Sequence, residues 1–306
     1  AVDLTKFDGA KELMELFPAG LFVPSTMNNG IYSIPETFYF WVLFYRTDVL
    51  TKLDIEIPDT MDDVEELLPE LKNRGLDFYY PTAGTTGQRT FAMTTPLLYQ
   101  NGASLYDTNA GDTTLDSEKA IEGLTRLTEL FTIYDLPPEI TNFYQHFRNG
   151  DIPIGVADYF MYSQLINAAP EIENSWGISL VPGLENNEGV VQRQTAGAAQ
   201  SSMILKTKRD TKVASNNGDM DRDEAAWEYL KWWMSTETQV EFGITLQTTY
   251  GQEYIWNSAN MEAFASLPWK SRDKQTILTQ MENIQETPRI PGTYMLEREL
   301  SNVYVE

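Results

Sequence analysis

The hydrophobic positions along the chain alternate between short apolar runs and longer stretches in which apolar residues recur at helical spacing. The run from Phe38 to Tyr45 is apolar or aromatic at every position and rich in β-forming residues, which predicts a strand buried on both faces. In the segment that follows, apolar residues fall on one side of a helix; they are Met61, Val64, Leu67, Leu68 and Leu71. This alternation of strands and helices predicts an α/β fold.

Turn and capping signals divide the rest of the chain into further elements. Thr60 can cap the first long helix, with Asp63 three residues on, and Gly75 can close it. Shorter strands are expected at 31–35, 78–80, 153–157, 176–181 and 203–205. Helices are expected at 117–133, 143–148, 159–168 and 224–234, with another beginning at Thr236, and residues 216–219 are expected to form a loop.

Composition and charge narrow the class of protein. The chain has 306 residues, a length that suggests two domains or one large domain, and its 42% hydrophobic content is enough for a sizeable core. It carries 22 Lys and Arg against 45 Asp and Glu, a net charge of −23. Such a charge argues against nucleic acid and against an anionic membrane surface as partners. No apolar run reaches the roughly 18 residues that a membrane-spanning helix needs.

Several kinds of chemistry are excluded by residue type. The chain has no cysteine and one histidine, His146, so disulfides, thiolate metal sites, thiol nucleophiles and two-histidine metal motifs cannot form. The acidic runs at 107–118 and 219–223 lack the glycine or the glutamate of a calcium loop, and we expect solvated turns there. Residues 84–87 lack the Gly-Lys pair of a phosphate-binding loop. We therefore expect no metal and no cofactor.

A series of short motifs follows in the order known from one family. They are Asn29-Gly30-x-Tyr32-x-Ile34-Pro35, Leu43 to Leu50, Pro58 to Asp63, Asn101-Gly102 with Leu105-Tyr106, Phe147 to Gly155, Trp176-Gly177-Ile178 with Pro182-Gly183, Ala225 to Trp233, and Pro291-Gly292 with Tyr294 and Arg298. The chain resembles, over nearly its whole length, the extracellular solute-binding proteins of family 1. This maltose-binding-protein-like group serves ABC importers.

The resemblance implies a two-lobed periplasmic-binding-protein-like fold of type II. On this basis residues 1–37 and 198–270 form a partial amino-terminal-type lobe, and residues 38–197 and 271–306 form the carboxy-terminal-type lobe. Family members have strands and helices before the Asn29-Gly30 region and longer helices at the end. We therefore expect a chain truncated at both ends, with an incomplete amino-terminal lobe.

The resemblance also implies a carbohydrate ligand, such as an oligosaccharide, captured between the lobes and delivered to the importer without catalysis. Aromatic rings stack on the apolar faces of sugars, and polar side chains hydrogen-bond the hydroxyls. Candidate ligand-binding residues fall where the family places its cleft; they are Glu36, Tyr39, Arg89, Thr90, Asp158, Tyr159, Phe160, Tyr162, Gln194, Tyr294 and Arg298. A ring of Tyr159, Phe160 or Tyr162 is expected to face the ligand, because a strand ends there and a helix begins.

The expected partners are a sugar and the membrane subunits of an ABC transporter, for a monomeric protein that binds no nucleic acid. The resemblance places the protein outside the cell, as a membrane-anchored lipoprotein of a Gram-positive bacterium, or in the periplasm. Three alternatives stay open: an acidic enzyme of the glycoside hydrolase type that uses two carboxylates, a binding protein for a peptide or polyamine, and a surface module without a small ligand.

Overall fold

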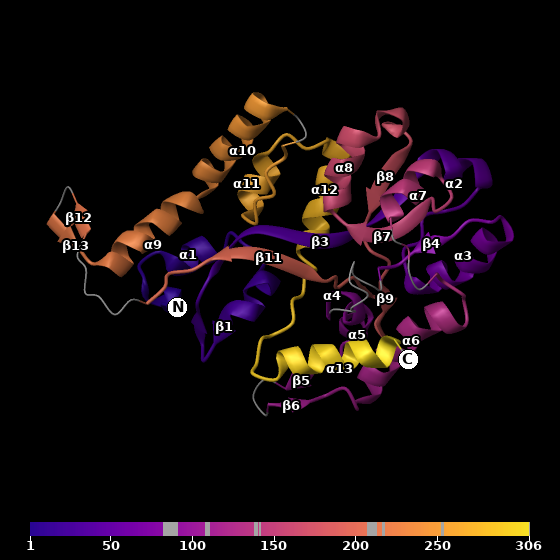
Figure 1. Ribbon diagram of the computed structural model, residues 1–306, viewed down its shortest axis with the longest axis horizontal. Helices are drawn as coiled ribbons and strands as arrows, with labels where there is room; N and C mark the ends of the chain where they lie inside the picture. The colour runs from indigo at the N-terminus through magenta and orange to yellow at the C-terminus, as the bar shows by residue number, and fades with distance from the viewer. Residues whose placement is uncertain are drawn as a thin grey trace. The chain divides into compact units, whose positions relative to one another are not determined.

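The computed structural model describes residues 1–81, 91–107, 111–137, 140, 142–206, 213–215, 218–251 and 254–305. The chain divides into two compact units. Unit 1 comprises Ala1–Tyr39 and Ala198–Lys270, and unit 2 comprises Phe40–Gly197 and Ser271–Glu306. The chain path therefore passes from one unit to the other three times (Figure 1).

The sheet of unit 2 is built on a long strand, β3 (Ile34–Arg46). Its second half pairs antiparallel with β7 (Ile154–Asp158) and with β8 (Trp176–Ser179), and β4 (Phe78–Tyr79) joins β7 in parallel. The predicted strand over residues 38–45 is thus confirmed and extends further at both ends. The strand is apolar because both of its faces are covered; the buried residues are Phe40, Val42, Leu43 and Phe44.

The chain between and after these strands forms the helices of unit 2 (Figure 1). They are α2 (Thr47–Leu53), α3 (Met61–Asn73), α4 (Phe91–Thr94), α5 (Pro96–Gln100), α6 (Glu118–Thr132), α7 (Phe143–Asn149), α8 (Phe160–Ala168), α12 (Ser271–Met281) and α13 (Thr293–Val305), with a short 3-10 helix η3 (Pro170–Ile172). Two small hairpins complete the unit: β5 (Tyr106–Asp107) with β6 (Asp112–Thr113), and β9 (Leu184–Glu185) with β10 (Val191–Gln192).

The predicted start of α3 is confirmed in detail. The Thr60 hydroxyl accepts the backbone N–H of Asp63, and the Asp63 carboxylate accepts the N–H of Thr60, which is a capping box. The apolar side of α3 packs in the main core of unit 2 with Leu43 and Val156 from the sheet. A second core in the same unit joins Leu300 of α13 to residues of α4, α5 and α6.

Unit 1 is largely helical. It contains η1 (Leu4–Lys6), α1 (Ala10–Met14), η2 (Ala19–Ser25), α9 (Arg222–Trp233), α10 (Thr236–Tyr250) and α11 (Met261–Ser266). Its strands are the first half of β3, β11 (Gly197–Ser202), and two hairpins, β1 (Thr26–Met27) with β2 (Gly30–Ile31) and β12 (Val213–Ser215) with β13 (Gly218–Met220). Asn28 and Asn29 form the first turn with φ values of 50° and 62°, a region that asparagine tolerates better than most residues.

Two expectations for unit 1 were wrong. The strand expected at 203–205 lies instead at residues 197–202, since β11 pairs with β3 even though its small and polar residues carry no strand signal. Pairing with a neighbouring strand outweighs local propensity. In the stretch expected to be a loop, Gly218 and Asp219 belong to β13, while residues 216 and 217 lie outside the described residues.

No helix within the described part of the chain is long and apolar enough to span a membrane.

Candidate functional site

The carboxyl end of β7 places Asp158 on the edge of the unit 2 core. Asp158 lies directly opposite Trp41 of β3 in the antiparallel register. Side chains alternate along a strand, so Asp158 shares a sheet face with Val156 and Ile154, which are both buried in the main core. Helix α8 begins two residues later and carries the chain away from the sheet. The site therefore combines a carboxylate with aromatic residues at the end of a strand, a common place for ligands in α/β proteins.

The carboxyl group of Asp158 has an unusual environment. Burial raises its pKa to about 6 because the charged form loses solvation, although the N–H of Phe160, which donates to Oδ1 at 2.7 Å, lowers it in part. Near neutral pH the carboxylate only accepts hydrogen bonds, and below pH 6 the group is mainly protonated and can also donate one. Either form can hydrogen-bond a hydroxyl group.

This pKa predicts how stability depends on pH. The folded state binds the Asp158 proton up to a pH of about 6, whereas the unfolded chain releases it near 3.8, so folding is progressively disfavoured as pH rises between these values. Replacing Asp158 with asparagine should remove that loss. Urea unfolding of both proteins from pH 4 to 7 should show the variant gaining stability relative to the parent up to about pH 6 and then no further. A difference that stays constant over this range contradicts the prediction.

Three aromatic rings follow Asp158, and they have different environments. Tyr159 is 4% exposed and stacks on Phe40 with ring centroids 5.0 Å apart. Tyr162 is 1% exposed, and its hydroxyl donates to Asp273 at 2.8 Å. Phe160 is 54% exposed. Packing inside unit 2 therefore covers the two tyrosines, and Phe160 is the ring of the three with free surface for stacking.

Gln194 lies in unit 2, close to one of the chain's passages into unit 1. It lines a small cavity together with Trp41, Tyr80 and Gln100. Trp41 thus connects the two parts of the site, because it faces Asp158 across the strand pair and also borders the cavity. The Trp41 and Tyr80 rings meet edge to face at 6.3 Å.

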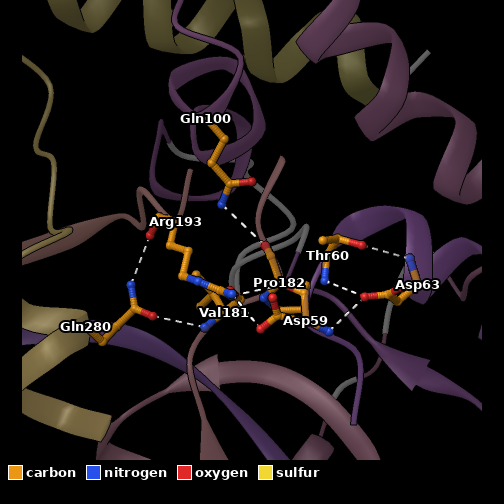
Figure 2. A network of polar contacts seen from close by, with 8 residues as sticks. All are labelled: Asp59, Thr60, Asp63, Gln100, Val181, Pro182, Arg193 and Gln280. Atoms are coloured by element: carbon orange, nitrogen blue, oxygen red, sulfur yellow. Dashed lines mark hydrogen bonds and ion pairs between the residues drawn. The ribbon is translucent and has the colours of Figure 1, made fainter. Parts of the chain in front are cut away.

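A polar network holds the backbone around Gln194 in place, and Figure 2 shows its part around Arg193, Val181 and Gln280. Gln100 Nε2 donates to the carbonyl oxygen of Gln194 at 2.9 Å. Gln280, which is fully buried, accepts the N–H of Val181 at 2.9 Å and donates to the carbonyl oxygen of Arg193 at 3.0 Å. The Arg193 guanidinium in turn donates to the carbonyl oxygen of Val181 at 2.8 Å and pairs with Asp59. Residues 193–194 are therefore fixed within unit 2 by side chains from α5, α12 and the segment just before α3.

No sequence pattern identified Gln100, Arg193 or Gln280 as parts of the site. Their hydrogen-bond partners are mostly backbone atoms, and the Gln100 and Gln280 bonds span 94 and 99 residues of sequence. The backbone next to this network also requires a glycine at position 183, which the sequence motif named but did not explain. A Cβ atom there would lie 2.3 Å from the carbonyl oxygen of Gln192, so this backbone approach needs glycine.

The other candidate residues lie on different elements. Glu36 and Tyr39 belong to the unit 1 half of β3, where the Glu36 carboxylate accepts the Ser202 hydroxyl at 3.0 Å. Tyr294 and Arg298 lie on α13; Tyr294 is 68% exposed, and Arg298 pairs with Glu299. Arg89 and Thr90 lie outside the described residues. Unit 2 thus relates Asp158 and Gln194 to Trp41, and the N–H of Phe160 bonds to Asp158.

Among the side chains that the structure describes, no group of three or more His, Cys, Asp or Glu is placed to hold a metal ion. Lone His146 is half exposed, with Nδ1 2.7 Å from a carboxylate oxygen of Asp151.

Comparison with solved structures identifies the fold. The chain is similar to maltose-bound MalE3 of T. maritima, with 17% identity, a TM-score of 0.66, and coverage of 99% of this chain and 74% of that one. It is also similar to MalE of Xanthomonas citri (16%, TM-score 0.67, 98% and 71%) and to a substrate-binding protein of Listeria monocytogenes in complex with cycloalternan (17%, TM-score 0.64, 99% and 73%). The expected α/β fold of the periplasmic-binding-protein type is confirmed.

Sequence comparison gives the family. A search of curated proteins found no match. The model of the bacterial extracellular solute-binding proteins matches residues 3–240, which is well over half of the chain. The chain therefore belongs to the family of bacterial extracellular solute-binding proteins.

Proposed function

We propose that this protein captures a carbohydrate, such as an oligosaccharide, and delivers it to an ABC importer. The observation that carries the proposal is that an exposed aromatic ring, Phe160, follows within two residues of the Asp158 carboxyl group at the end of β7. An open aromatic face suits the apolar side of a sugar ring, and a carboxyl group beside it suits a hydroxyl. Solved proteins of similar fold that carry maltose or cycloalternan support the same class of ligand.

The two units fit the lobes of such a protein. We assign unit 2 as the carboxy-terminal-type lobe and unit 1 as part of the amino-terminal-type lobe. Within unit 2 we assign Asp158, Phe160 and Gln194 to ligand contact, with Tyr159 and Tyr162 supporting them from the core. Glu36 and Tyr39 are the proposed contributions of unit 1, and Arg89, Thr90, Tyr294 and Arg298 remain proposed contacts from elsewhere in the chain.

The proposed role also assigns location and partners. The protein acts outside the cell, as a membrane-anchored lipoprotein of a Gram-positive bacterium or in the periplasm. It works as a monomer, and the membrane subunits of an ABC importer are its partners. It needs no catalytic step, since capture and release of the solute are sufficient for transport.

Titration calorimetry against a panel of oligosaccharides tests the ligand class. We expect binding heat from at least one sugar of the panel, at a stoichiometry of one sugar per chain. Heat from a peptide or a polyamine, with none from any sugar, would reject the carbohydrate and keep the binding-protein fold. A protein whose melting temperature and heat signal respond to no small molecule would reject solute capture itself.

One observation favours a second candidate function. The pKa of Asp158 is raised to about 6, and a raised pKa is also typical of the general acid of glycoside hydrolases. Incubation with aryl glycosides tests this candidate. Turnover that is abolished by Asp158→Asn would establish the enzyme, whereas absence of turnover in a protein that binds sugar would reject it.

A further inference from the structure

Two amide side chains, one buried and one half-buried, line one small cavity in unit 2. Gln100 and Gln194 border it together with the Trp41 and Tyr80 rings, and its volume is about 10 Å³. The Oε1 atoms of both glutamines are buried and have no hydrogen-bond partner among the residues that the structure describes. Gln100 as a whole is 4% exposed. A buried acceptor without a donor destabilises the fold, so two beside one cavity need an explanation.

The orientation of both amides is fixed by their neighbours. Gln100 Nε2 donates to the carbonyl oxygens of Gln194 at 2.9 Å and Pro182 at 3.5 Å, so turning the amide over would place oxygen against oxygen (Figure 2). Gln192 Nε2 donates to the carbonyl oxygen of Val190, which leaves its Oε1 to accept Gln194 Nε2 at 3.4 Å. Both Gln100 and Gln194 therefore have an acceptor oxygen left over.

We propose that this cavity is a binding site for one O–H donor, which hydrogen-bonds to Oε1 of Gln100 and Oε1 of Gln194 and is a water molecule in the free protein. The volume is close to that of one water-sized sphere, about 10–15 Å³. A water molecule has two protons to donate, which matches two acceptors. An ammonium ion or a metal ion is disfavoured because the lining side chains Trp41, Tyr80, Gln100 and Gln194 carry no compensating charge.

The bound donor would connect the core of unit 2 to the ligand site. Gln100 comes from α5, and Gln194 lies beside a passage of the chain between the units. A shared donor holds the Gln194 side chain in one conformation and so prepares it for ligand contact. The site itself does not rest on the proposed carbohydrate ligand, because all residues that line it belong to unit 2.

A crystal structure of the full chain without ligand tests the proposal. We expect density for one oxygen atom about 2.7–3.2 Å from both amide oxygens. An empty cavity, an atom bonded to only one amide, or another side chain that donates to both oxygens would each overturn it. Crystals grown with maltose separate the two sources of the donor: a retained water assigns it to solvent, and a sugar hydroxyl in the same place assigns it to the ligand.

Relaxation dispersion of water oxygen-17 gives a test in solution. Gln194→Met removes one acceptor with little change in volume, and it should lose one long-lived water relative to the parent. Gln275→Met, at an exposed position of α12, is the matched control and should lose none. An equal number of long-lived waters in the parent and in Gln194→Met would overturn the proposal, even if the variant is less stable.

Discussion

Replacing Phe160 with alanine should weaken carbohydrate binding by about tenfold or more and leave the melting temperature nearly unchanged. The ring is 54% exposed, so it contributes little to the core and offers its free surface to a ligand. Covering that surface at roughly 25 cal/mol per Å² yields one to two kcal/mol, and about 1.4 kcal/mol corresponds to a factor of ten. Calorimetry with the best sugar of the panel and a thermal melt of the same sample measure both quantities.

Two further variants make this test specific. Phe160→Trp keeps an aromatic face and should retain most of the affinity. Tyr162→Ala should instead lower stability by about 3–5 kcal/mol, because it empties a fully buried position and removes a donor from the Asp273 carboxylate. If Phe160→Ala binds sugar like the parent, the Phe160 ring does not contact the ligand. Tyr294 and Arg298 then become the next residues to replace.

Replacing Arg46 with methionine should destabilise unit 2 by about 2–4 kcal/mol. The Arg46 guanidinium is buried, and it donates to the carbonyl oxygens of Phe147 and Arg148 at 2.9 Å, where α7 ends. Those carbonyls have no partner within their own helix, and methionine cannot supply one. Denaturant unfolding should show a lower midpoint with an unchanged slope.

Asp48→Asn is the control for Arg46. Asp48 pairs with the same guanidinium through two hydrogen bonds of 2.7 and 2.8 Å, but its side chain is 45% exposed. Exposed partners of ion pairs contribute about 0–1 kcal/mol, so this variant should be only slightly destabilised. Equal losses in the two variants would mean that the ion pair, and not the bonds to the end of α7, accounts for the effect.

Several strands and helices of unit 2, among them β3 and α3, could be predicted because their signals are local. Phe38 to Tyr45 is apolar throughout because the strand is covered on both faces. The capping box of α3 is formed by Thr60 and Asp63, which lie within four residues of each other. β11 could not be predicted, because Gly197–Ser202 forms a strand through its pairing with β3 and not through its own composition. Here tertiary context decided the conformation.

The same distinction applies to the site. Asp158 ends a strand with an apolar signal and Phe160 comes two residues later, so their place was predictable, and α8 begins within a residue of the expected position. Which ring would be free was not predictable: burial of Tyr162 depends on Asp273 and Trp176, which are distant in sequence. Gln100 and Gln280 carry no local signal, because a buried polar residue is recognised only by partners that folding brings to it.

The side chains that hold residues 193–194 differ from the surface of this strongly acidic chain in how they respond to pH and salt. Gln100 and Gln280 hold the backbone through amide groups, which neither gain nor lose a proton and are not weakened by dissolved salt. The charge of surface carboxylates changes with pH, and salt screens their interactions. A transported solute would therefore meet the same arrangement of Gln194 in acidic or saline surroundings, even while the repulsion among the surface charges changes. Next to the Arg193–Asp59 ion pair, the backbone of residues 193–194 is thus also held by two polar side chains that do not titrate.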